Sequence, residues 1–79
     1  LRRVGNAESA LMDLGFPAVR VRCHGEVARI ELPADRMGEA VARADEISGI
    51  VKSAGFQFVS LDLGGYNMGN MNRTQRRTT

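Results

Sequence analysis

The segment from Val19 to Leu32, VRVRCHGEVARIEL, constrains the fold of this 79-residue chain more than any other feature. Apolar and charged residues alternate on both sides of a His24-Gly25 pair. A period of two residues is typical of a β-strand with one buried face, and a glycine between two such runs is typical of a tight turn. The segment therefore predicts a β-hairpin with one apolar face and one face that carries arginines.

The position of the turn predicts the register of this hairpin. With His24-Gly25 as the loop, Val21 faces Ala28 on the apolar side, and Arg20 faces Arg29 on the other side. Two arginines that lie directly opposite each other repel. This face is therefore costly to form unless an anion or a carboxylate meets it.

The arginine-bearing side of the hairpin is the main candidate site. One interpretation is capture of a phosphate or carboxylate by Arg20 and Arg22, with Arg29 nearby, through charge-assisted hydrogen bonds. The other is a solvated strand face whose arginines pair with Glu31 and Asp62. The spacing alone leaves both open, and carboxylates at such positions are expected to orient arginines rather than to act as acids or bases.

Two helices are predicted, over residues 7–14 and 36–54, each begun by a polar cap and ended by a glycine. The caps are Asn6 and Asp35, and the glycines are Gly15 and Gly55. The buried stripe of the longer helix is predicted to consist of Met37, Ala40, Val41, Ala44, Ile47, Val51 and Ala54.

Residues 56–63, FQFVSLDL, alternate as a third strand, with Val59, Leu61 and Leu63 on one side. The second strand, the long helix and the third strand form a βαβ unit, whose two strands should be parallel. The predicted fold is therefore α+β in the order α-β-β-α-β, a three-stranded mixed sheet with two helices on one face. The bare face should be covered by another domain or subunit, and it carries Arg20, Arg22, Arg29, Glu31, Phe58, Ser60 and Asp62.

Composition narrows the class of protein. The formal net charge is +2, and arginines cluster at both ends of the chain, so the remaining body is slightly acidic. This argues against a general nucleic-acid binder; an RNA-binding role through Arg20, Arg22, Phe58, Tyr66 and the tail is the weakest alternative. A single cysteine, Cys23, supports neither a disulfide framework nor a metal cluster. We expect no catalytic residue, no metal ligand and no membrane span, and a cytoplasmic location.

The end of the chain differs from the rest. Residues 64–72, GGYNMGNMN, are predicted to form a loop, and residues 73–79 a basic disordered tail. Residues 1–72 would then be one small domain. Because the chain begins at Leu1 without an initiator methionine, we expect it to be a fragment of a longer protein.

Three segments carry a resemblance to a known family: AESALMDLGF, RVRCHGEVARIEL and AGFQFVSLDLGGYNMGNMN. Together they resemble the C-terminal region of the ATP-dependent sacrificial sulfur transferases, over roughly residues 5–72. This family belongs to the pyrophosphate-loop ATP-utilising superfamily and takes part in making the nickel-pincer nucleotide cofactor. The most specific parts are the hairpin and the closing L-D-L-x-G-Y segment.

The resemblance implies an enzyme whose upstream domain binds ATP and Mg²⁺ and adenylates a carboxylate of a pyridinium nucleotide. A cysteine upstream of the matched region then gives up its sulfur. The chain itself would bind no cofactor and would not be catalytic alone. Its implied partners are the N-terminal ATP-binding domain, a phosphate-bearing nucleotide substrate and further copies in a homo-oligomer, with neither a membrane nor a nucleic acid.

The resemblance also implies site residues. Glu8, Arg20, Arg22 and Glu31 match residues that the family places around its substrate phosphate and subunit interface, and Tyr66 with Asn67 would close the site. The family has an arginine after the tyrosine, where this chain has Asn67. A neutral amide cannot supply that charge, so either Arg29 compensates or the ligand differs. A non-catalytic assembly module that docks through the arginine-bearing face is the alternative function.

Overall fold

The computed structural model describes residues 2–66, so the predictions for Asn67 and for the tail lie outside the described residues. The elements in chain order are α1 (Arg2–Leu14), β1 (Arg20–His24), β2 (Val27–Glu31), the 3-10 turn η1 (Ala34–Arg36), α2 (Met37–Ala42), α3 (Ala44–Ser53) and β3 (Phe58–Leu61). The sheet order is β1-β2-β3, antiparallel between β1 and β2 and parallel between β2 and β3. The predicted α+β fold and its α-β-β-α-β order are confirmed.

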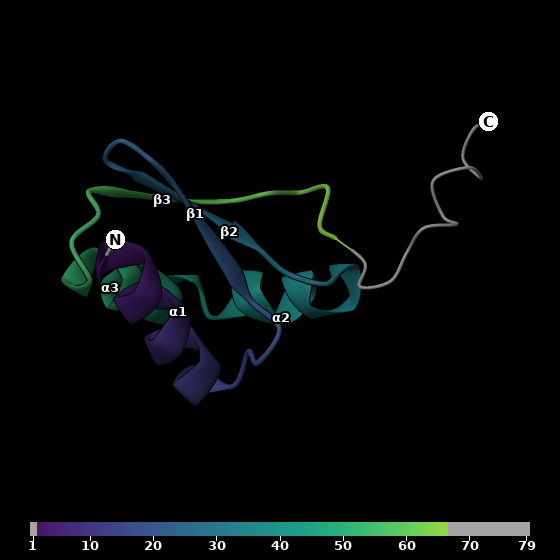
Figure 1. The fold of residues 1–79 in the computed structure, drawn as a ribbon. Helices are drawn as coiled ribbons and strands as arrows, with labels where there is room; N and C mark the ends of the chain where they lie inside the picture. The colour runs from purple at the N-terminus through teal and green to yellow at the C-terminus, as the bar shows by residue number, and fades with distance from the viewer. Residues whose placement is uncertain (1, 67–79) are drawn as a thin grey trace.

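The helices gather on one side of the sheet, where the hydrophobic core lies (Figure 1). Alternation within the strands produces this core, because Val21, Ala28 and Ile30 all point toward the helices and are buried. From α1 the core receives Ala7 and Leu11. Within residues 2–66, no helix is both long and apolar enough to span a membrane.

A helix that ends in Gly-Phe occurs twice, and both phenylalanines are buried. The end of α1 is closed by bonds from the Gly15 amide to Met12 O (3.1 Å) and from the Phe16 amide to Leu11 O (3.0 Å). This pair of hydrogen bonds requires a residue with a positive φ after the helix, and Gly15 has a φ of +123°. Gly55 ends α3 with a φ of +118° and precedes Phe56. The two predicted glycine stops are therefore confirmed.

Arginines cover both phenylalanines. The Arg36 Cζ atom lies 4.8 Å from the centroid of the Phe16 ring, and Arg36 also donates a hydrogen bond to Gly15 O (2.8 Å). At the other phenylalanine, the Arg3 Cζ atom lies 4.5 Å from the Phe56 centroid. Arginine at these positions therefore serves the fold rather than a ligand, and it ties each helix end to a distant segment.

The predicted register of the hairpin is wrong by two residues. The loop is Gly25-Glu26, so that Arg22 pairs with Arg29 and Arg20 pairs with Glu31. A shift by two residues keeps every side chain on its predicted face, which is why the apolar pattern could not detect it. Gly25, with a φ of +63°, takes the first rather than the second place in the turn.

The predicted starts of both helices and the continuity of the longer one are also corrected. Asn6 lies inside α1, which begins at Arg2, because Arg3 packs onto Phe56 and stabilises the first turn. Asp35 lies in η1 and makes no capping bond to α2. The longer helix breaks at Arg43, whose φ of −113° and ψ of +31° separate α2 from α3.

Three apolar residues, Val41, Ala44 and Leu63, were wrongly predicted to be buried. Val41, which is 62% exposed, lies at the break between the helices and lines an apolar groove of about 200 Å³ beside β3. Leu63 is 80% exposed because β3 ends at Leu61, two residues earlier than predicted. The alternation of the third strand therefore holds only within β3.

Candidate functional site

The outward side of the sheet carries the candidate site, which we call the arginine face. Its members come from all three strands and from the residue that follows β3. They are Arg20, Arg22, His24, Val27, Arg29, Glu31, Phe58, Ser60 and Asp62. Strand pairing arranges them in rows, because residues directly opposite each other point to the same side of a sheet.

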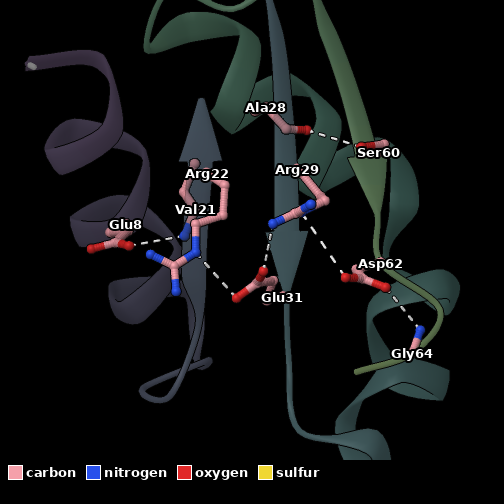
Figure 2. Close-up of polar contacts among 9 residues, drawn as sticks. All are labelled: Glu8, Val21, Arg22, Ala28, Arg29, Glu31, Ser60, Asp62 and Gly64. Atoms are coloured by element: carbon pink, nitrogen blue, oxygen red, sulfur yellow. Dashed lines mark hydrogen bonds and ion pairs between the residues drawn. The ribbon is translucent and has the colours of Figure 1, made fainter. Parts of the chain in front are cut away.

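Glu31 connects the two central arginines of the arginine face (Figure 2). Its Oε1 atom lies 3.2 Å from Arg22 Nε, and its Oε2 atom lies 2.9 Å from Arg29 Nη2. The Glu31 side chain is only 14% exposed, whereas the two arginines are 46% and 39% exposed. One carboxylate therefore serves two cations, and Asp62 near Arg29 is the second carboxylate of the cluster. Parts of both arginine side chains remain exposed to solvent.

Arg29 has an incomplete set of partners. Its Nε atom is buried and has no hydrogen-bond acceptor among residues 2–66. Asp62 Oδ2 is the near carboxylate at 4.0 Å, which is too long for a hydrogen bond, while Asp62 Oδ1 accepts a bond from the Gly64 amide (2.9 Å). A buried donor without an acceptor is costly, and Asp62 offsets part of this cost through its charge rather than through a hydrogen bond.

Tyr66 lies beside Arg20 at one end of the arginine face. The Arg20 Cζ atom is 5.3 Å from the Tyr66 ring centroid, the geometry of a cation–π contact. The Tyr66 hydroxyl donates to Ala18 O, and its amide donates to Leu32 O (3.1 Å), so the ring is fixed at both ends. Arg20 makes no ion pair within the part of the chain that is described, and its guanidinium is exposed.

Glu8 contacts the backbone of β1 rather than an arginine side chain. Its Oε2 atom accepts a hydrogen bond from the Val21 amide (2.8 Å), which belongs to the open edge of β1 (Figure 2). A carboxylate that occupies the free N–H groups of an edge strand blocks pairing with another strand. The role of Glu8 in orienting arginines stays a prediction.

The remaining polar clusters of the described residues serve the fold. Arg43 donates to Glu46 Oε1 (3.0 Å) and to Leu14 O (3.5 Å), and the hydrogen bond with Glu46 raises the pKa of Arg43 above its ordinary value. Cys23 is half-buried and lies 3.2 Å from Arg3 Nη2. Residues 2–66 contain no cluster of three or more histidines, cysteines or carboxylates that could hold a metal ion.

The structural roles of Arg3, Arg36 and Arg43 were missed by sequence reasoning. Each contacts a phenylalanine ring and the backbone carbonyl of a distant loop or helix end. The only available signal was the number of arginines, which does not separate those that stabilise the fold from those that face solvent.

The chain is similar to two curated proteins, whereas no protein-family model matches it. Over 74 residues, 94% of this chain, it is 47% identical to pyridinium-3,5-bisthiocarboxylic acid mononucleotide synthase of Lactiplantibacillus plantarum. Over 75 residues, 92% of this chain, it is 43% identical to an uncharacterised protein of Synechocystis. The chain spans only 27% and 28% of the length of these relatives. The predicted resemblance is thereby confirmed.

Proposed function

We propose that this chain, which is similar to a sulfur-inserting mononucleotide synthase over nearly all its length, is the C-terminal domain of an ATP-dependent sulfur transferase. The parent protein would act in nickel-pincer nucleotide cofactor biosynthesis. The part of the relative that has no counterpart here would hold the ATP and Mg²⁺ chemistry. Within the parent, the arginine face of this domain would bind the phosphate of the nucleotide substrate.

The observation that carries this proposal is the shared carboxylate of Glu31. Two guanidinium groups, those of Arg22 and Arg29, share this one close carboxylate, and both arginine side chains remain more than a third exposed to solvent. Phosphate supplies negative charge and several acceptor oxygens in one group. The relative's name states a mononucleotide product, and a mononucleotide carries one such phosphate.

A titration of the whole chain with inorganic phosphate tests the proposal. Backbone amide shifts in the NMR spectrum should saturate, with the largest changes at Arg22 and Arg29. Arg22→Ala should weaken phosphate binding about ten- to a hundredfold, because a hydrogen bond to a charged group contributes about 1.5–3 kcal/mol. Arg2→Ala is the matched control, since Arg2 is an exposed arginine of α1 outside the arginine face, and it should leave the affinity unchanged.

A flat titration would contradict the proposal, as would equal losses in the two variants. The alternative is an assembly module that docks through the arginine face, and the exposed Phe58 on that face is the observation in its favour. Assembly predicts a sedimentation coefficient that rises with protein concentration and falls in Arg22→Ala. Homo-oligomer formation by the parent is a separate proposal, which sedimentation of the parent protein itself would test.

A further inference from the structure

The arginine face has an uncharged end. His24 pairs with Val27, and Val27 pairs with Phe58, so these three side chains form one row across the three strands. The next row on the same face contains Arg22 and Arg29. The face therefore consists of an aromatic and aliphatic row beside a cationic row.

Phe58 differs from the other two phenylalanines of the chain. Phe16 and Phe56 are 1% and 3% exposed, whereas Phe58 is 59% exposed. Its backbone is fixed, because its amide donates to Glu26 O (3.0 Å) and its neighbour Val59 packs against the core. Phe58 therefore presents an aromatic surface from a rigid strand, which costs little conformational entropy when a ligand binds.

The spacing of the two rows suits a mononucleotide. Residues two positions apart on one strand are separated by about 6.6 Å. In a mononucleotide, a ribose separates the phosphate from a planar ring, so both groups can reach adjacent rows at once. A phosphate on Arg22 and Arg29 would place the ring over Val27 and Phe58.

We propose that Phe58, with Val27 and His24, forms the subsite for the planar ring of the nucleotide. This inference rests on the proposed function, since the phosphate would bind the cationic row. The nitrogen of a pyridinium ring is cationic, so the face of the ring is attracted to the electron-rich face of an aromatic ring. Stacking thus favours the orientation with the ring on Phe58 and the phosphate on the arginines.

Three probes separate the ring from the phosphate. Nicotinamide mononucleotide carries a cationic pyridinium ring and a phosphate. Its dihydropyridine form carries an uncharged, non-aromatic ring on the same phosphate, and ribose 5-phosphate carries no ring. Isothermal titration of the full chain should give the oxidised nucleotide an affinity about five- to tenfold above that of the other two, the increment expected for one stacked ring.

Phe58→Ala should remove this difference and leave the affinity for ribose 5-phosphate unchanged. Phe58→Tyr should keep the difference, because the ring surface is retained. Met12→Ala is the matched control: Met12 is 44% exposed, but it belongs to α1 on the helical side of the sheet, so the nucleotide affinity should not change.

Three other results of these titrations would each lead to a different conclusion. If all three probes bind equally and Arg22→Ala weakens them all, the phosphate site stands and the ring subsite is refuted. If none of the probes binds, the proposed function fails as well. If Phe58→Ala changes only the sedimentation behaviour, Phe58 belongs to a protein interface and the ring subsite is refuted.

Discussion

At the residue scale, Glu31 stabilises the arginine face because it contacts both Arg22 and Arg29. Glu31→Gln removes the charge and keeps the shape, so the two arginines repel each other across the strands. We expect a loss of about 1 kcal/mol in the free energy of unfolding, measured by urea denaturation, and a smaller loss in high salt. Phosphate affinity should rise about threefold in the same variant, since the competing carboxylate is gone.

Glu46→Gln is the control for this substitution, because Glu46 is 50% exposed and pairs with one arginine of the same turn, Arg43. It should change stability less than Glu31→Gln and leave phosphate binding unchanged. A Glu31→Gln variant that binds phosphate more weakly would show that Glu31 orients the arginines for the anion. That result would still be compatible with a phosphate site, but not with competition between Glu31 and the ligand.

Which residues face outward on the hairpin could be predicted, but which of them pair across the strands could not. Alternation fixes the parity of a strand, so Arg20, Arg22 and Arg29 lie on the predicted side. It does not fix the pairing, because a loop at His24-Gly25 and one at Gly25-Glu26 satisfy the same pattern. The sequence did predict ion pairs of these arginines with Glu31 and Asp62, which the structure shows. That Arg22 and Arg29 share Glu31 could be learned only from the structure.

At the element scale, the connection between α3 and β3 depends on Gly55. A Cβ atom at this position would lie 3.0 Å from both Cγ and Cδ of Arg3, and the φ of +118° disfavours any side chain. Gly55→Ala should therefore lower the free energy of unfolding by about 1–3 kcal/mol in urea denaturation. An unchanged stability would mean that Arg3 does not hold α1 against this turn.

The control for Gly55→Ala lies within α3. Gly49 has ordinary helical geometry, and a Cβ atom there would meet nothing within 4 Å. Gly49→Ala should raise stability by about 0.5–1 kcal/mol, because alanine restricts the unfolded chain and favours a helix. Both variants replace glycine by alanine, but the free energy of unfolding should fall in one and rise in the other. The difference would show that the backbone geometry at Gly55, rather than general helix propensity, causes the loss.

The helix ends at glycines were predicted correctly, whereas the helix starts predicted at Asn6 and Asp35 were not. Gly15 and Gly55 end their helices as expected, since a left-handed position favours glycine. The start of α1 depends on Arg3, which reaches Phe56. The break at Arg43 coincides with a side chain that reaches Leu14. No window of neighbouring residues contains either contact.

At the scale of the whole molecule, the fold is one-sided. The helices lie on one side of the sheet (Figure 1), where the core is, and the arginine face lies on the other side. The order of elements follows from the sequence because each strand and helix has its own period and its own stop. The contents of the bare face were predicted too, but its division into a cationic row and an aromatic row depends on the register across three strands.

The last prediction concerns the tail, residues 73–79. A chain shortened to residues 1–72 loses three arginines, and its formal net charge falls from +2 to −1. If phosphate binds the arginine face, its affinity at 0.2 M salt should change by less than about twofold, because salt at this concentration screens the effect of the net charge of the chain. The free energy of unfolding should also be unchanged, since the described core comes from residues 2–66.

Titration with a single-stranded RNA oligonucleotide gives the opposing outcome. A nucleic-acid role would show tight binding that falls steeply between about 0.05 and 0.2 M salt and is lost with the tail, since each neutralised phosphate adds to the salt dependence. A specific nucleotide site would keep its preference for the mononucleotide after the tail is removed, with a shallow salt dependence set by one phosphate. Comparison of residues 1–79 with residues 1–72 therefore distinguishes a nucleotide site on the sheet from nonspecific attraction by the net charge of the chain.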